Sequence, residues 1–316
     1  MGNAFPVVMH QGHEQAWMPL KLDMQLANTS EQIDSNIEAS LRRKYIPFTD
    51  LLNKEQGTVS IVGSGPSLKE TWRDLKKRRG DIVACNASNQ FLLERGIVPK
   101  YVMIFDADIL AEEFVTTPHE DVTYLLASRC HPKLFEHLEG YRVVVWHAKG
   151  DLNIERLLEK NKRMEPMIGG GSAAVTRSMF MVHPMGYRDM HLYGADSSYN
   201  NAETKSRYAR NVIEFDDLRG ETDESHIRRS TTVEKFLAIG VNGRVFHTTP
   251  WMAAQAEDFK VLAPSLQRLG VKISVHGDGL IPHLARAMNL DVDDQSRVKQ
   301  IAREVSLKAR TLWLNL

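Results

Sequence analysis

The sequence predicts an α/β protein built on a mostly parallel β-sheet flanked by helices, and three observations support this fold class. Short apolar runs typical of buried strands alternate with helix-length segments between residues 58 and 193. The first run, at residues 59–62, stops at glycines and leads into a helical pattern. The 316 residues have a globular composition, 42% hydrophobic and 25% charged. Strands separated by helices pair in parallel through right-handed crossovers, so the pattern indicates one sheet covered by helices.

The individual elements follow from the same periodicity. Strands are expected at residues 59–62, 82–85, 101–105, 123–127, 142–146, 190–193 and 272–275. Helices are expected at residues 69–79, 173–183, 232–237, 251–262 and 264–269. Ser172 directly precedes the second of these helices, so it is predicted to cap that helix.

The rest of the chain divides around this core, which is expected at residues 58–200. Residues 1–57 lack strand periodicity and contain Ile37, Leu41 and Tyr45 at helical spacing, which predicts an N-terminal helical arm. Residues 201–232 are polar and crowded with charges, as in a functional loop or lid. Residues 233–316 are expected to complete the core and to end in an amphipathic helical tail.

The overall charge and the cysteine content limit the function classes. Forty basic and forty acidic residues give a formal net charge of zero, so no overall field attracts nucleic acid, although a local basic groove is compatible with this balance. Cys85 and Cys130 are too few for a disulfide framework or a zinc cluster. The sequence has neither a secretory leader pattern nor an apolar run of membrane-spanning length. We therefore expect a cytoplasmic protein with reduced thiols, for which nucleic acid is not the expected partner.

The turn at residues 63–68 is the first candidate binding site. Gly63 and Gly65 follow a strand and open into a helix, so backbone amides and the helix dipole could face a phosphate. The alternative is a tight turn made for packing. Leu68 replaces the third glycine of the dinucleotide fingerprint, and Asn86 stands where an acid would hold a ribose, which disfavours NAD. A P-loop is excluded because no Gly-Lys-Ser/Thr follows.

Carboxylates and polar side chains follow other predicted strands. Asp106 and Asp108 come directly after the strand at residues 101–105, where an acidic pair suits Mg²⁺ or Mn²⁺ bridging a diphosphate. The alternative is a turn in which Asp108 caps the following helix. Asn86 and Ser88 occupy the matching edge after the preceding strand, and Asp196 follows the strand at residues 190–193. These residues are therefore expected at the ligand-binding edge of the sheet.

Two further features could contribute to a site. The glycines at residues 169–171 and Ser172 again open a helix, which could face a phosphate or a base or could merely cap a buried helix. None of the twelve histidines has zinc-site spacing. His226, close to Arg228 in the charged loop, is the candidate general base, and His131 is a weaker candidate of the same kind.

Several of these motifs recur together in a known family. They are residues 61–68 (Ile-Val-Gly-Ser-Gly-Pro-Ser-Leu), residues 85–87, residues 99–101 with Asp106, residues 170–172, and residues 193–196. In this order and spacing they resemble the hydroxymethylpterin diphosphokinase-like (MptE-like) family, which also appears in flagellin-modifying proteins and in phage or prophage genomes. A more distant likeness is to bacterial sialyltransferases that use a CMP-sugar.

The resemblance implies a Rossmann-like nucleotide-binding fold and a transferase acting on an activated phosphate ester. Together with the turn chemistry, it predicts nucleotide-binding roles for Gly63, Ser64, Gly65, Ser67, Asn86, Ser88, Gly170, Gly171 and Ser172. Asp106 and Asp196 would face a metal or the acceptor, with Asp106 and Asp108 as predicted metal ligands.

The leading hypothesis is a nucleotide-dependent transferase that moves a diphosphate or glycosyl group from an ATP or nucleotide-sugar donor to a hydroxyl acceptor. Glycine-loop amides and Mg²⁺ or Mn²⁺ would offset the phosphate charge, and His226 or an aspartate would deprotonate the acceptor. Two alternatives remain: a non-catalytic nucleotide-binding or assembly module, and a phage-type enzyme that modifies a DNA base. A homo-oligomer is compatible with each of them.

Overall fold

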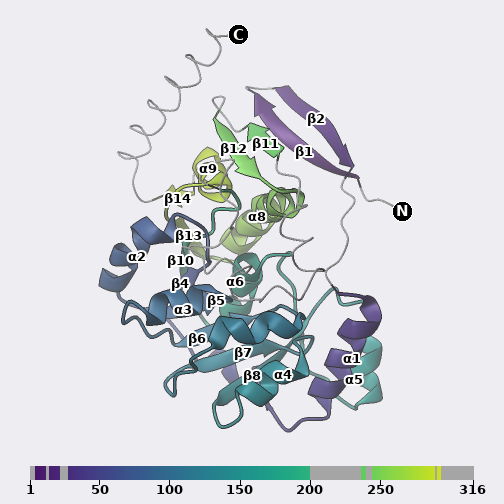
Figure 1. The fold of residues 1–316 in the computed structure, drawn as a ribbon. Coiled ribbons are helices and arrows are strands. Elements are labelled where there is room, and N and C mark those ends of the chain that lie inside the picture. Colours follow the sequence, from purple (N-terminus) through teal and green to yellow (C-terminus); the bar gives the residue numbers. More distant parts are fainter. Residues whose placement is uncertain are drawn as a thin grey trace, which may run out of the picture.

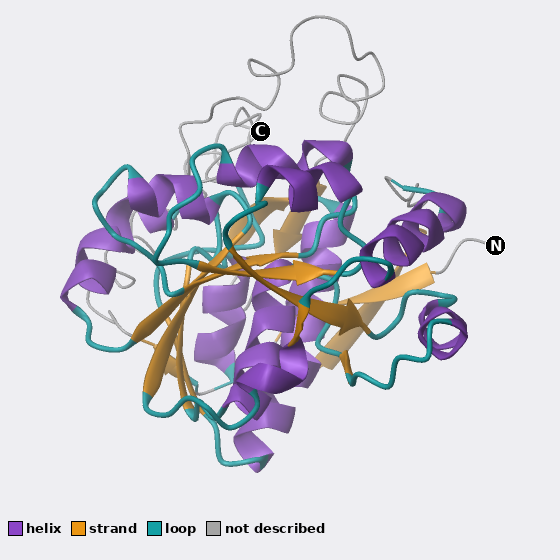
Figure 2. Cartoon of the chain, turned by 90° about the horizontal axis from the view of Figure 1, so that it is seen from below, coloured by secondary structure: helices purple, strands orange, loops and turns teal. Residues whose placement is uncertain are grey.

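The central sheet is parallel throughout the residues that this computed structural model describes, which are 4–11, 14–21, 28–199, 236–239, 244–288 and 290–292. Helices lie on both sides of the sheet (Figures 1 and 2). In spatial order the strands are β14 (Asp291–Val292), β13 (Lys272–Val275), β10 (Asp189–Tyr193), β4 (Thr58–Val62), β5 (Asp81–Cys85), β6 (Tyr101–Ile104), β7 (Thr123–Ala127), β8 (Arg142–Ala148) and β3 (Ile46–Pro47). A further short strand, β9 (Met167–Ile168), pairs with β8.

All seven strands predicted from apolar runs are present, each within two residues of its expected ends. The prediction succeeds because these strands are covered on both faces, so nearly every residue along them is apolar. In β4, for example, Val59, Ile61 and Val62 are fully buried. The predicted α/β fold with a mostly parallel sheet is confirmed.

The strand order reverses at β4. The chain builds β4 to β8 outward in one direction, and β10, β13 and β14 then extend the sheet on the other side of β4. Connections leave the carboxyl ends of β4 and β10 toward opposite flanks, which opens a crevice between them. This switch point fixes where a ligand can bind.

The helices connect these strands. They are α2 (Leu68–Lys77), α3 (Ser88–Leu93), α4 (Pro132–His137), α5 (Ile154–Lys160), α6 (Ala174–Met185), α8 (Pro250–Arg268) and α9 (Leu280–Ala287), with 3₁₀ helices η1 (Phe48–Leu51) and η2 (Ile109–Val115). The prediction of two helices at residues 251–262 and 264–269 is wrong, because α8 continues through Pro264. Its apolar face continues too: Phe259, Ala263 and Leu266 are all fully buried, and this packing offsets the missing backbone hydrogen bond.

The predicted helix at residues 232–237 is also wrong where the structure describes it. Residues Phe236–Ile239 form strand β11, which pairs antiparallel with β12 (Val245–Thr248). Periodicity cannot distinguish a short buried helix from a strand. Here the pairing with β12, which the local sequence does not reveal, determines that these residues form a strand.

The N-terminal region is only partly the predicted helical arm. Helix α1 (Ser30–Leu41) is capped by Thr29, whose side chain accepts a hydrogen bond from the Gln32 amide at 3.2 Å. Its buried face packs against α5. Before it, β1 (Ala4–Gln11) and β2 (Glu14–Lys21) form an antiparallel hairpin. The prediction that this region contains no strands is therefore wrong. The available signal was the glycine at position 12 between two strand-length runs.

Two predicted segments lie outside the described residues, namely the charged loop at residues 201–232 and the amphipathic tail at residues 295–314. Of the helices that are described, none is both long and apolar enough to cross a membrane.

Candidate functional site

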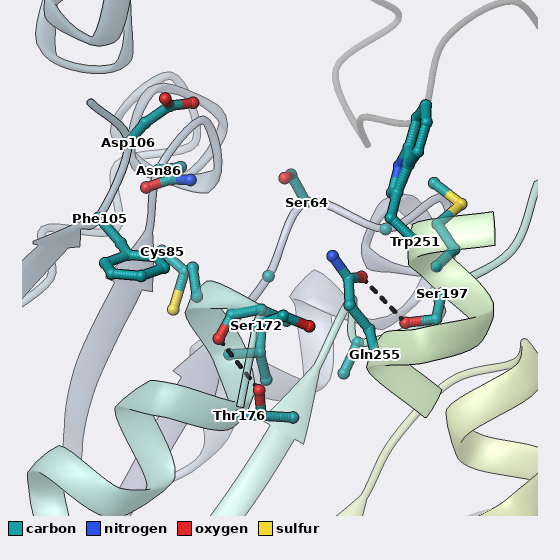
Figure 3. Close-up of a pocket in the computed structure, with 18 of the residues that line it drawn as sticks. Ser64, Cys85, Asn86, Phe105, Asp106, Ser172, Thr176, Ser197, Trp251 and Gln255 are labelled. Atoms are coloured by element: carbon teal, nitrogen blue, oxygen red, sulfur yellow. Dashed lines mark hydrogen bonds between the residues drawn. The ribbon is translucent and has the colours of Figure 1, made fainter. Parts of the chain in front are cut away.

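A pocket of about 340 Å³ opens at the switch point. Its walls include the turns after β4, β5, β6, β7 and β10, the first turn of α6, and the first turns of α8 (Figure 3). Asn86 and Asp106 lie on one side, and Trp251 and Gln255 lie on the other. Ser64 and Ser172, from two turns that are far apart in the sequence, line the same pocket.

The glycine turn after β4 is built for close approach of two strand ends. The Gly63 amide donates to the Tyr193 carbonyl at 2.8 Å, and the Gly65 amide donates to the Gly194 carbonyl at 2.8 Å. A Cβ atom at either Gly63 or Gly65 would lie 2.6 Å from the Gly194 oxygen, a distance that real Cβ contacts do not reach. Both glycines are therefore required for packing between β4 and β10, as the alternative interpretation of this turn held.

Gly63→Ala is therefore expected to lower the free energy of unfolding by about 2 kcal/mol, because the added methyl group must push apart two hydrogen-bonded turns. Gly169→Ala is the matched control, since no atom lies within 4 Å of its Cβ position. Urea denaturation of both variants measures the effect. Equal stability of the two variants would contradict the packing role of Gly63.

Asp196, at the end of β10, binds the start of α2. Its Oδ2 accepts from the Ser67 amide at 2.6 Å, and its Oδ1 accepts from the Ser67 hydroxyl at 2.6 Å. Burial raises the pKa of the Asp196 carboxyl to about 7, and the two hydrogen bonds from Ser67 partly oppose that shift. The hydrogen-bond acceptor at the start of α2 is thus a side-chain carboxyl group of the protein itself. This differs from the expectation that these amides face a ligand phosphate.

The start of α6 is arranged differently. None of the described residues accepts a hydrogen bond from the amides of Ala174, Val175 or Thr176, and all three residues line the pocket. Ser172 is not the cap that was predicted, because Ala173 occupies the cap position. The Ser172 amide and hydroxyl instead donate to Asp258 Oδ2 of α8, at 2.8 and 2.7 Å. Among the described residues, the first turn of α6 therefore keeps donors without acceptors at the pocket wall.

A buried arginine supports this turn from behind. Arg177 is 7% exposed and donates to the carbonyls of Lys149, Ile168 and Gly171 at 3.2, 2.7 and 2.5 Å. Its guanidinium also lies 4.5 Å from the ring centre of Phe105, a residue of the pocket wall. No described carboxylate forms an ion pair with Arg177. A positive charge thus lies in a low-dielectric environment next to the unpaired amides.

The structure brings five of the nine predicted nucleotide-binding residues to the pocket: Gly63, Ser64, Gly65, Asn86 and Ser172. Four do not line it: Ser67, Ser88, Gly170 and Gly171. Ser67 is bound to Asp196, and Ser88 is fully buried, with its hydroxyl donating to the Val62 carbonyl at 2.7 Å. The two glycines have positive φ angles of 112° and 82° and face neighbouring side chains instead.

The predicted acidic pair is divided. Asp106 lines the pocket, and its Oδ1 accepts from the Asp108 amide at 3.1 Å. Asp108 is not part of the pocket wall, and its side chain caps η2 by accepting from the Leu110 amide at 3.0 Å. Within the described ranges, no three or more His, Cys, Asp or Glu side chains are grouped as a metal site.

Neither histidine that was predicted as a general base lies among the described residues that line the pocket. His226 lies outside the described residues. His131 caps α4, with its side chain accepting from the Lys133 amide at 3.2 Å. Of the three predicted catalytic residues, Asp106 and Asp196 therefore line the pocket.

Sequence reasoning missed several residues of the wall: Phe105, Arg129, Ser197, Trp251 and Gln255. Arg129 pairs with Asp151 at 2.8 Å and stacks on Phe105 at 4.8 Å. Its position just after a predicted strand was a usable signal. Trp251 and Gln255 come from α8, and nothing in the local sequence indicates that this helix reaches the switch point.

The fold and the site define a doubly wound, Rossmann-like α/β protein with a ligand pocket at its topological switch point. The chain belongs to the 6-hydroxymethylpterin diphosphokinase MptE-like family, whose sequence profile matches residues 31–202. The family membership expected from the motifs is confirmed.

Solved structures extend this comparison. The MAf glycosyltransferase from Magnetospirillum magneticum AMB-1 is similar with a TM-score of 0.57 and 17% identity, over 80% of this chain and 37% of that one. This chain thus spans about 37% of that protein's length. Two mammalian sialyltransferase structures have TM-scores of 0.31 and 0.32 at 11% and 12% identity, over 53% and 66% of this chain and 65% and 77% of theirs. No curated protein matches the sequence.

At these identities the likeness concerns the fold. Together with the family it identifies a nucleotide-related, transferase-like fold.

Proposed function

We propose that this protein is a nucleotide-dependent transferase that binds the phosphate of an activated nucleotide donor at the start of α6. The observation that carries the proposal concerns the first turn of that helix. Ala174, Val175 and Thr176 line the pocket, and their amides have no acceptor among the described residues. Such amides and the helix dipole together favour a bound anion.

One buried positive charge beside the pocket supports an anionic donor. Arg177 lies directly behind the unpaired amides and contacts backbone carbonyls and the Phe105 ring instead of a carboxylate. In a buried environment its charge acts over a longer range than it would in water. A phosphate or diphosphate would complete the hydrogen bonds of the first turn and offset this charge.

The other side of the pocket suits a hydroxyl acceptor. Asp106 offers a carboxylate that could accept the acceptor's proton. Asn86 has a φ angle of 51°, and its amide donates to the Met103 carbonyl at 3.0 Å. Its side-chain Oδ1 is buried and has no hydrogen-bond partner among the described residues. An acceptor or ribose hydroxyl would satisfy that oxygen. The role of His226 as a base stays a prediction.

Mg²⁺ or Mn²⁺ is compatible with this arrangement. Magnesium commonly uses one or two protein carboxylates together with substrate phosphates and water, so Asp106 could hold it without Asp108. In that case the acceptor's proton would go to another group, such as the predicted base His226. The ion would neutralise charge on the donor phosphates as the bond to the leaving group breaks.

A donor panel tests the proposal and separates its two subclasses. Thermal unfolding is followed with ATP, a UDP-sugar and a CMP-sugar, each with and without Mg²⁺. The family name motivates ATP and diphosphate transfer, and the name of the similar glycosyltransferase motivates the sugar donors. Stabilisation by one donor class is expected, because a ligand that binds only the folded chain raises its melting temperature. No stabilisation by any donor would overturn the proposal.

Ala174→Pro tests the carrying observation directly. Ala174 is the first residue of α6, and Ala173 before it is extended (φ −92°, ψ 147°), so proline fits there and removes one amide. Donor affinity is expected to fall about tenfold or more, because one hydrogen bond to a charged group is lost. Calorimetric titration measures it.

Ala174→Val is the matched control, since it adds a side chain of similar size but keeps the amide. Unfolding stability of both variants should stay within about 0.5 kcal/mol of the parent protein. If the proline and valine variants lose donor affinity equally, the added side-chain volume and not the missing amide is responsible. The phosphate would then be bound elsewhere.

A further inference from the structure

A carboxylate of α8 already binds two hydrogen-bond donors beside the start of α6. Asp258 Oδ2 accepts from the amide of Ser172 at 2.8 Å and from its hydroxyl at 2.7 Å. Ser172 is exposed, lines the pocket, and lies two residues before Ala174, the first residue of α6. A side chain of the protein therefore takes donors that adjoin the amides proposed to hold the donor phosphate.

The glycine before Ser172 allows this contact to form. Gly171 has a φ angle of 82°, and a Cβ atom there would lie 2.9 Å from Leu262 Cδ1 and 3.0 Å from Asp258 Oδ2. Any side chain at this position would press against α8, in addition to the strain of a positive φ angle. The glycine run that resembles a phosphate loop is thus also the surface on which α8 packs.

The Asp258 carboxylate has no described lysine, arginine or histidine as an ion-pair partner, whereas its neighbour Glu257 pairs with Lys260 at 2.9 Å. Its charge nevertheless acts on Arg177 over a longer distance. Burial lowers the pKa of the Arg177 guanidinium, and the carboxylates of Asp151 and Asp258 oppose that shift. Asp258 therefore supplies part of the negative charge that a donor phosphate would bring to this place.

The same contact holds one wall of the pocket. Gln255 lies one helical turn before Asp258 and lines the pocket, where its Oε1 accepts from the Ser197 hydroxyl at 3.4 Å (Figure 3). Trp251, in the first turn of α8, lines the pocket as well. A ligand that takes Ser172 from Asp258 therefore removes a link between this wall and the start of α6.

We propose that the contact between Asp258 and Ser172 is autoinhibitory, and that a donor phosphate displaces the Asp258 carboxylate when it binds. This inference rests on the proposed phosphate site at the start of α6. A phosphate there would present its oxygens to the Ser172 donors as well as to the helix amides, and two anions that share the same donors repel each other. The contact thus lowers the apparent affinity for the donor, and donor binding releases α8.

Asp258→Asn tests this inference. Asparagine keeps a side-chain oxygen that can accept from Ser172, but it lacks the charge that repels a phosphate. Calorimetric titration with inorganic pyrophosphate measures the affinity without requiring the identity of the donor. The variant is expected to bind pyrophosphate about fivefold or more tightly than the parent protein, because the competing charge is gone. If Asp258 instead held Ser172 in place for the ligand, the same variant would bind more weakly.

Glu257→Gln is the matched control. It removes the same charge from the next residue of α8, whose side chain pairs with Lys260, and affinity should change by less than about twofold. Equal or weaker binding by Asp258→Asn would overturn the autoinhibitory role and leave the phosphate site intact. An equal gain in both variants would also overturn it, because the effect would then come from net charge alone.

The double variant Asp258→Asn, Ala174→Pro locates the bound pyrophosphate. The gain from Asp258→Asn should be lost, since the proline removes an amide of the phosphate site. A gain that survives the proline would place the pyrophosphate away from α6 and overturn the inference. If neither the parent protein nor Asp258→Asn binds pyrophosphate or any donor of the panel, the proposed phosphate site fails, and the autoinhibitory contact fails with it.

Discussion

Replacing Arg177 by methionine is expected to lower the free energy of unfolding by roughly 3 to 4 kcal/mol and to abolish donor binding. Methionine keeps most of the apolar stem but removes the donors to three carbonyl oxygens. The Ile168 carbonyl keeps the Lys149 amide as a donor, whereas the carbonyls of Lys149 and Gly171 lose a hydrogen bond at a cost of about 1 to 3 kcal/mol each. Those carbonyls, of Lys149, Ile168 and Gly171, belong to the segments that lead into α6. Their release would misplace the first turn of that helix.

Arg188→Met is the matched control. Arg188 also donates to two carbonyls, those of His183 and Tyr187, at 2.7 and 2.8 Å. It is exposed, so water replaces the lost donors and stability should change by no more than about 0.5 kcal/mol. Urea denaturation and calorimetric donor titration of both variants measure the difference. Equal stability of the two variants would show that burial of Arg177 does not matter for the loop.

The second large effect concerns pH and Asp196. Burial raises the pKa of this carboxyl from 3.8 to about 7. An acid whose pKa is higher in the folded chain binds more protons when folded, so its contribution is full below about pH 4 and is lost as pH rises through about 7. Each pKa unit corresponds to about 1.4 kcal/mol, so the loss across this window is on the order of a few kcal/mol.

Asp196→Asn isolates this contribution. Asparagine has nearly the same shape and can still exchange hydrogen bonds with the amide and hydroxyl of Ser67, but it does not titrate. The stability of the parent relative to this variant should therefore fall between about pH 4 and pH 7, as measured by urea denaturation at several pH values. Parallel pH profiles would show that Asp196 ionises normally, and its carboxylate would then be a stronger candidate for proton transfer in the pocket.

The arrangement of the site explains why the proposed donor location differs from the first expectation. Two glycine turns open helices at the switch point, and the sequence alone treats them alike. The structure separates them, because Asp196 binds the start of α2 while no described residue accepts from the first amides of α6. The donor phosphate is accordingly proposed at α6.

The sequence by itself determined the parallel sheet and the set of turns at its ligand edge. Buried strands such as β4 and β7 can be recognised in the sequence because nearly every residue in them is apolar, and the residue that follows a strand lies at the edge of the sheet. Asn86, Asp106 and Asp196 could therefore be placed at that edge from local patterns. Their approximate location could be predicted without knowing where distant segments of the chain lie.

Only the tertiary structure decided which of these groups are free to bind a ligand. Ser67 is satisfied by Asp196, which is 129 residues away, and Ser172 by Asp258, which is 86 residues away. Trp251 and Gln255 reach the pocket on a helix whose position the local sequence does not indicate. The sequence shows which groups can donate hydrogen bonds, but long-range packing determines which groups accept them. Whether the amides of a turn bind another part of the protein or a substrate therefore depends on the folded structure.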